Sequence, residues 1–141
     1  LHDALPIYKA FSGTAVYTTT INKVPVADVI KLNLGTVAEN ASVYLNGEYI
    51  GTVIDSPYQL YIPAEKFKGQ DELVVRVANS MANRIAYMDK KGVDWKIFYN
   101  VNMSARKKEN VKNGIFDASD WEPKSSGLLG PVTLTPAMVK Q

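Results

Sequence analysis

The chain contains no cysteine and only one histidine, His2, in 141 residues. The lack of cysteine excludes disulfides, thiolate metal sites and a cysteine nucleophile. No apolar run approaches the roughly 20 residues of a membrane-spanning helix. The formal net charge of +2 is too small to indicate a nucleic-acid or membrane-surface partner. What remains is an ordinary globular composition, 46% hydrophobic and 21% charged, with no sign of a cofactor.

The first seven residues, Leu1–Ile7, look foreign to the rest of the chain. They resemble the translation of a common short-read sequencing adapter, a scar found at the ends of metagenomic gene fragments. The alternative is a natural linker. With the scar set aside, His2 is lost and with it any Ser-His-Asp arrangement. By length, residues 8–141 are then expected to form one domain.

The clearest local signal is an Asn46-Gly47 pair between two short runs that alternate in hydrophobicity. A two-residue type I′ turn needs φ > 0 at both central positions, which Asn and Gly tolerate best. The flanking runs are therefore predicted to pair as antiparallel strands, with Val43 and Leu45 on one face and Tyr44 on the other.

Other stretches rich in β-branched and aromatic residues predict further strands. They lie at 13–21, 28–34, 58–62, 71–78, 95–103 and 128–134. A short helical turn is expected at 63–67, where a proline stands at the first helical position. The stretch from Asn79 to Ser126 is less regular, and no long helix is predicted. Together these features predict an all-β fold, a jelly-roll β-sandwich.

The order of these pieces resembles the galactose-binding-like β-sandwich domains attached to large glycoside hydrolases. The sugar-binding domains of family 2 share the Gly-Thr-Ala-x-Tyr strand at 13–17, the Asn-Gly hairpin and the Leu-Val-Val-Arg-Val-Ala-Asn strand at 73–79. A closer likeness is to the C-terminal domain of family 106, the α-L-rhamnosidase-like enzymes. There an Asn-Arg pair, here Asn83-Arg84, and a Ser-Gly-Leu-Leu-Gly-Pro-Val segment, here 126–132, follow in this order. The segment after Arg84 is longer than in that pattern.

This resemblance implies an accessory domain with no catalytic residue of its own, because in such enzymes the acid and base carboxylates lie on a separate catalytic domain. It implies the catalytic domain of a parent glycoside hydrolase as partner, and an oligo- or polysaccharide as a second one. The implied location is periplasmic or extracellular. The implied role is to brace the catalytic domain and to contribute a loop to the substrate cleft.

Candidates for sugar binding lie in the irregular region after Asn79. Sugar recognition combines a flat aromatic face with a few fixed polar groups. Trp95 and Trp121, with Asp94 and Tyr99, are therefore candidate ligand-binding residues, since the loops of a sandwich carry function. The alternative is that both indoles fill the core or plug loops.

Asn83 and Arg84 are further ligand-binding candidates, because a guanidinium can bind sugar hydroxyls or a carboxylate bidentately. The alternative, which we favour, is a structural arginine that ties the long loop to the sandwich or to the catalytic domain.

An acidic loop offers a weaker candidate. Asp117, Asp120 and Glu122 could hold a hard cation through oxygen ligands. The simpler interpretation is that Ser119 and Glu122 form a capping box for a short turn that Pro123 ends. We therefore predict no metal site.

Two other functions remain open from the sequence. An autonomous carbohydrate-binding module would present Trp95 and Trp121 exposed and coplanar on one surface. A purely structural interface domain would bury both indoles and expose a large apolar patch on one sheet.

Overall fold

The computed structural model describes residues 10–97 and 107–137 of the chain. The chain divides into two compact units. Gly13–Asn79 and Ser126–Gln141 form the first, which we call the sandwich unit. Leu1–Ser12 and Ser80–Ser125 form the second, the insert unit.

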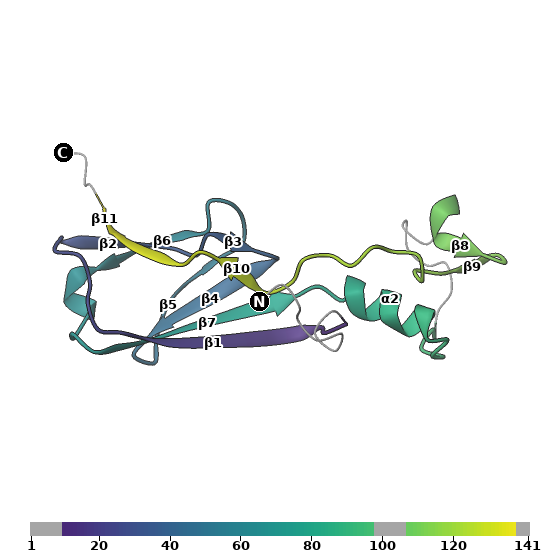
Figure 1. The fold of residues 1–141 in the computed structure, drawn as a ribbon, viewed down its shortest axis with the longest axis horizontal. Helices are drawn as coiled ribbons and strands as arrows, with labels where there is room; N and C mark the ends of the chain where they lie inside the picture. Colours follow the sequence, from purple (N-terminus) through teal and green to yellow (C-terminus); the bar gives the residue numbers. More distant parts are fainter. Residues whose placement is uncertain (1–9, 98–106, 138–141) are drawn as a thin grey trace. The chain divides into compact units, whose positions relative to one another are not determined.

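The sandwich unit is built from antiparallel strands in two main sheets (Figure 1). The four-stranded sheet has the order β1-β7-β4-β5, and the three-stranded sheet has the order β11-β2-β6. A short pair, β10 and β3, completes the unit. The bounds are β1 Gly13–Ile21, β2 Val29–Asn33, β3 Thr36–Val37, β4 Asn40–Leu45, β5 Glu48–Val53, β6 Gln59–Pro63, β7 Asp71–Asn79, β10 Leu128–Gly130 and β11 Thr133–Pro136. The predicted all-β sandwich class is confirmed.

The core lies between the two sheets and follows the alternation of the sequence. Ile30 and Leu32 of β2 are fully buried, as are Val43 of β4 and Val77 of β7, because every second residue of a strand faces the same side. The predicted turn at 63–67 is present as a 3-10 helix, η1, over Ala64–Lys66.

The Asn46-Gly47 hairpin has the predicted conformation, with φ of 52° at Asn46 and 81° at Gly47. Asn46 also does more than turn the chain. Its side-chain amide donates to Asp71 Oδ1 over 2.6 Å, and its side-chain oxygen accepts the N–H of Glu72 at 2.9 Å. The hairpin is thereby fastened to the start of β7.

Asp71 is a buried carboxylate with its own set of donors. The backbone N–H groups of Lys68 and Gly69 reach its two oxygens at 2.8 and 3.0 Å. Burial raises the pKa of Asp71, but the hydrogen bonds from Asn46, Lys68 and Gly69 outweigh it and hold that pKa below the usual 3.8. The negative charge is therefore part of the folded structure.

The closing segment, predicted as one strand over 128–134, is two short strands. Pro131 cannot donate to a ladder, and it separates β10 from β11, which belong to different sheets. The start of β10 contacts the opening strand, β1. The N–H of Leu128 donates to the Tyr17 hydroxyl at 3.2 Å. A Cβ at Gly127 would lie 2.3 Å from that same hydroxyl oxygen. The opening strand and the closing segment therefore contact each other, through Tyr17 on one side and Gly127 and Leu128 on the other.

Gly127→Ala is expected to lower the free energy of unfolding by about 2–3 kcal/mol, because it strains a left-handed backbone and displaces the Tyr17 hydroxyl from the N–H of Leu128. The φ of Gly127 is +86°. Gly47→Ala is the matched control, since Gly47 has a φ of +81° but no atom within 4 Å of the added Cβ. It should lose only about 1–2 kcal/mol. Urea unfolding followed by far-UV circular dichroism measures both, and equal losses would show that the contact with Tyr17 carries no strain.

The insert unit contains a helix that the sequence did not predict. Helix α2 spans Ala82–Lys90, and the short elements η3 (Lys108–Asn110), β8 (Val111–Lys112) and β9 (Ile115–Phe116) follow. The strand predicted over 95–103 is wrong in its described part, because Trp95–Ile97 has no strand structure. Its remaining residues lie outside the described part of the chain.

No helix in the described residues is long and apolar enough to cross a membrane. The boundary expected after residue 7 lies outside the described residues, and one domain over 8–141 stays a prediction.

Candidate functional site

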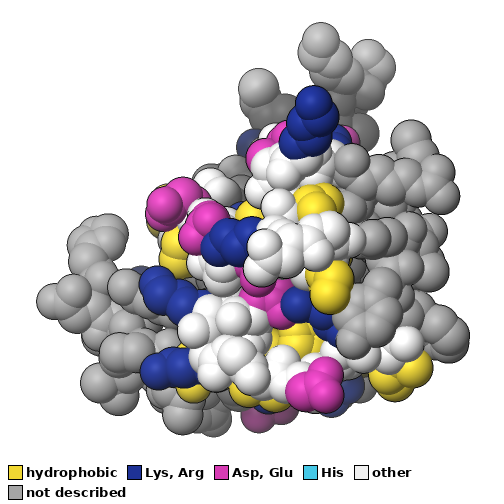
Figure 2. All heavy atoms as spheres, turned by 90° about the vertical axis from the view of Figure 1, so that its right-hand side faces the viewer, with side chains coloured by type: hydrophobic (Ala, Val, Ile, Leu, Met, Phe, Trp, Pro, Cys, Tyr) yellow, Lys and Arg dark blue, Asp and Glu magenta, His cyan; other side chains and the backbone are white. Residues whose placement is uncertain are grey.

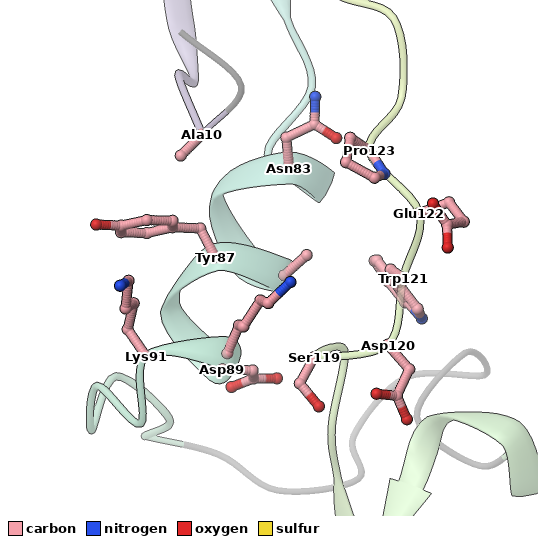
Figure 3. A pocket seen from close by; sticks show the side chains of 12 residues that line it. Ala10, Asn83, Tyr87, Asp89, Lys91, Ser119, Asp120, Trp121, Glu122 and Pro123 are labelled. Atoms are coloured by element: carbon pink, nitrogen blue, oxygen red, sulfur yellow. The ribbon is translucent and has the colours of Figure 1, made fainter. Parts of the chain in front are cut away.

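The insert unit holds an open cleft of about 860 Å³. Helix α2 forms one wall, and the segment 119–123 forms the other (Figure 3). The lining residues are Ala10, Asn83, Ala86, Tyr87, Asp89, Lys90, Lys91, Ser119, Asp120, Trp121, Glu122 and Pro123. We call this space the α2 cleft.

Asp89, near the end of α2, organises this unit. Its side chain is only 1% exposed. One carboxylate oxygen accepts the Trp95 indole N–H at 2.7 Å and pairs with the Lys96 ammonium at 2.7 Å. The other accepts the backbone N–H of Ala118 at 2.8 Å. A single buried carboxylate therefore joins the helix, the Trp95 segment and the segment after β9.

Asn83 joins the first turn of α2 to the other wall of the cleft. Its amide donates to the Lys124 carbonyl at 2.7 Å, and its oxygen accepts the Lys124 N–H at 2.8 Å. The residue is buried, and this two-way bond uses one donor and one acceptor of its side chain. Asn83 thus acts as a structural clamp in the cleft wall.

Trp121 stands between two hollows. It lines the α2 cleft and also a smaller cleft of about 360 Å³. Its indole N–H donates to Asn110 at 2.8 Å, and its ring meets Phe116 edge-on, with centroids 5.7 Å apart. The residue is half-buried, so part of the ring is open to a ligand while its polar end is held by the protein.

The acidic loop is held by its own hydrogen bonds and by Lys112. Asp117 accepts both the backbone N–H and the hydroxyl of Ser119, and Lys112 lies 3.4 Å from Asp117 and 3.0 Å from Asp120. The Ser119 hydroxyl lowers the pKa of Asp117, and this outweighs the opposing effect of burial. The hydrogen bond to Asp120 raises the pKa of Lys112.

The short turn expected at Ser119 is present at Ser119–Asp120, where the Trp121 N–H donates to the Ala118 carbonyl at 3.0 Å. The capping-box bonding is wrong, because the Ser119 hydroxyl and its N–H both bond to Asp117. Within residues 10–97 and 107–137, no group of three or more side chains is placed to hold a metal ion.

Charges of both signs are mixed around the insert unit. Figure 2 shows basic and acidic side chains interspersed on the side where α2, β8 and β9 lie, without a patch of one sign. In the α2 cleft the basic Lys90 and Lys91 accompany the acidic Asp120 and Glu122. The charges of these four side chains balance, so they give the cleft no excess of one sign.

Similar proteins were found by sequence and by structure. No family model matches the chain. A putative beta-glucuronidase from Formosa agariphila is 33% identical over 89% of this chain, which corresponds to 12% of that protein. The solved structure of a rhamnosidase from Novosphingobium sp. PP1Y superposes on 93% of this chain with a TM-score of 0.72 and 31% identity, and the match covers 12% of the rhamnosidase. The chain resembles a small β domain of glycoside hydrolases.

A second solved structure shows the fold alone. A β-D-mannosidase from Dictyoglomus thermophilum matches 87% of this chain with a TM-score of 0.51 and 21% identity, over 16% of its own length. The chain thus spans between about an eighth and a sixth of these proteins. The resemblance predicted from the hairpin, the Asn-Arg pair and the closing segment is confirmed at the level of glycoside hydrolase domains.

The structure brings two of the six predicted ligand-binding residues into the α2 cleft, namely Asn83 and Trp121. Trp95 does not line it, and its indole N–H is bonded to Asp89. Arg84 is exposed, with its guanidinium 5.9 Å from the centre of the Tyr87 ring, and Asp94 is exposed as well. The remaining candidate, Tyr99, lies outside the described residues. Ligand binding by all six stays a prediction.

Sequence reasoning missed the cleft residues around the C-terminal end of α2 and the role of Asp89. Tyr87, Lys90 and Lys91 line the cleft. The only signal for them was the run Asn83–Lys90, whose spacing is compatible with a helix but lacks a capping residue: Met81 stands at the N-cap and makes no side-chain hydrogen bond.

Proposed function

We propose that this chain is the C-terminal accessory domain of a periplasmic or extracellular glycoside hydrolase of the α-L-rhamnosidase type, joined to a catalytic domain and non-catalytic by itself. The observation that supports this most is the match to the Novosphingobium rhamnosidase, which covers 93% of this chain at 31% identity and only 12% of the rhamnosidase. A match of that extent corresponds to one part of a larger enzyme.

The buried carboxylates support a non-catalytic role. Glycoside hydrolysis needs two carboxyl groups that flank one bond and exchange protons with it. Asp71 and Asp89 are both shielded and already engaged by protein donors. Each is therefore suited to holding the backbone in place.

The relatives differ in their named activities, since one is a rhamnosidase and one a putative beta-glucuronidase. A sandwich that accompanies both is suited to a task that does not depend on the bond being cut. Bracing the catalytic domain is such a task.

A second candidate function is carbohydrate binding in the α2 cleft. It is favoured by one observation: Trp121 and Asn83 both line an open cleft of about 860 Å³. Since the indole N–H of Trp121 is bonded to Asn110, a sugar there would rest on the face of the ring.

The experiment that tests the main proposal begins with the upstream gene sequence and the parent enzyme it encodes. The full enzyme is expected to hydrolyse 4-nitrophenyl α-L-rhamnoside and not 4-nitrophenyl β-D-glucuronide. The isolated chain should hydrolyse neither, and deletion of residues 8–141 should lower the melting temperature or the soluble yield of the enzyme. Hydrolysis by the isolated chain, or a full enzyme active only on the glucuronide, would contradict the proposal.

A further inference from the structure

The outer face of the four-stranded sheet carries a group of side chains outside the α2 cleft. Strand alternation turns Val43 and Val75 into the core, so their neighbours Tyr44 and Arg76 lie on the opposite face. The register places Val16 and Ser42 beside Arg76, and Tyr49 beside Tyr44. We call this group, which comprises Val16, Ser42, Tyr44, Tyr49, Thr52 and Arg76, the tyrosine face.

The two rings of the tyrosine face are held in a fixed arrangement. Tyr44 and Tyr49 come from the two arms of the hairpin, and their centroids are 5.5 Å apart at an interplanar angle of 61°. In this edge-to-face pairing one ring supports the other without covering it. Tyr49 is 56% exposed, so its ring presents an open apolar surface to solvent. The C–H groups of a pyranose pack on such a surface.

A row of hydroxyl groups borders these rings. Thr52 Oγ1 lies 2.9 Å from the Tyr49 hydroxyl and 2.8 Å from Ser42 Oγ. Each hydroxyl can donate one hydrogen bond and accept two, so this chain of three leaves capacity for a ligand. Its members are fixed by one another before any ligand arrives, which reduces the entropy lost on binding.

Arg76 supplies a positive charge with no negative partner in the described residues. Its guanidinium carbon lies 4.9 Å from the centre of the Tyr44 ring, and no carboxylate among residues 10–97 and 107–137 forms an ion pair with it. A guanidinium stacked on a ring keeps its N–H groups free at the rim, where they match the two oxygens of a carboxylate. The charge that complements this face is therefore an anionic group of planar, bidentate shape.

We propose that the tyrosine face binds a saccharide that bears a carboxylate, a uronic acid unit of an oligo- or polysaccharide. The sugar ring packs on Tyr49, the row of hydroxyls bonds to the sugar hydroxyls, and Arg76 binds the carboxylate. This site lies wholly in the sandwich unit, and it depends neither on the α2 cleft nor on the activity of a parent enzyme.

The test is a titration of the chain with trigalacturonate, with maltotriose as an uncharged trisaccharide of the same length. Trigalacturonate is expected to give saturable NMR shifts at Tyr49, Thr52 and Arg76, and maltotriose should bind at least tenfold more weakly. Arg76→Gln should weaken binding of trigalacturonate by about 10- to 100-fold. Tyr49→Ala should weaken it by about 3- to 10-fold.

Two variants act as controls in the same titration. Tyr61→Ala removes a tyrosine of similar exposure, 61%, from β6 in the other sheet, and it should leave binding unchanged. Trp121→Ala alters the α2 cleft and should also have no effect. Far-UV circular dichroism of each variant establishes that the sandwich is intact.

Four results would overturn the proposal. No saturable shift at millimolar trigalacturonate would remove the site altogether. Equal binding of maltotriose, or binding unaffected by Arg76→Gln, would show that the site does not recognise a carboxylate. Loss of binding with Trp121→Ala and not with Tyr49→Ala would assign the saccharide to the α2 cleft. None of these results bears on whether the chain belongs to a rhamnosidase, because that is read from the activity of the parent enzyme.

Discussion

Asp89→Ala is expected to lower the free energy of unfolding of the insert unit by about 3–5 kcal/mol, because removal of one partner leaves the others buried and unpaired. The carboxylate is 1% exposed, and Lys96, its ion-pair partner, is 17% exposed. After the substitution Lys96 loses its counter-charge, and the N–H groups of Trp95 and Ala118 lose their acceptors. The α2 cleft should lose its shape together with the unit.

Tryptophan fluorescence measures this effect separately from the sandwich. The chain has two tryptophans, Trp95 and Trp121, and both belong to the insert unit. Urea unfolding followed by their emission should shift to much lower urea in Asp89→Ala. The matched control is Asp94→Ala, which removes an exposed carboxylate of the same unit and should change the free energy by no more than about 0.5 kcal/mol. Equal curves for the two variants would show that Asp89 has no organising role.

The sandwich could be predicted because its signals are local. The Asn46-Gly47 turn fixes which strands pair, and the alternation in β2 fixes which residues are buried, so that Ile30 and Leu32 are both fully buried. Each of these features follows from backbone preference and a period of two, which a single sequence displays directly.

The insert unit could not be predicted in the same way, because its structure depends on contacts between distant polar groups. Asn83 clamps Lys124, which is 41 residues away in sequence, and Asp89 accepts a hydrogen bond from Ala118, 29 residues away. A lone aspartate in an irregular region carries no periodic signal. Helix α2 spans only nine residues and buries only Asn83, so its apolar pattern is too short to indicate a helix.

The sequence therefore predicted the region of the candidate site but not the contacts that form it. The sequence pointed to the irregular stretch after Asn79, and the cleft lies there. The sequence led to the same prediction for Trp95 and Trp121, but their indole N–H groups have different partners. Trp95 donates to Asp89, and Trp121 donates to Asn110. Only Trp121 lines the cleft, and that difference arises from the fold of the insert unit.

The closing segment makes a contact that only the fold reveals. Gly127 and Tyr17 lie at opposite ends of the chain, yet the hydroxyl of Tyr17 stands where a side chain at 127 would be. No local pattern connects these two residues, so their contact could not be predicted from the sequence.

Asp71→Asn is expected to lower the free energy of unfolding of the sandwich unit by about 2–4 kcal/mol at pH 7 and to weaken its dependence on acid. Asparagine has one acceptor oxygen in place of two, so its NH₂ would face either the Gly69 N–H or the donors of Asn46 and Lys68. The loss should appear in the sandwich unit because β7 begins at this residue and crosses the centre of the four-stranded sheet.

The pH dependence follows from the sign of the pKa shift at Asp71. Its pKa in the folded chain is below the usual 3.8, so the unfolded chain takes up the proton first as the pH falls. The contribution of Asp71 to stability is therefore complete above about pH 5, and it is lost as the pH falls from the pKa of the unfolded chain toward that of the folded chain.

Far-UV circular dichroism in urea at pH 7, 4 and 3 measures this loss of stability. Glu72→Gln is the matched control, because Glu72 is the exposed neighbour on the opposite face of β7. The wild type and Glu72→Gln should lose more stability than Asp71→Asn between pH 7 and pH 3; parallel losses in all three would place the acid sensitivity elsewhere.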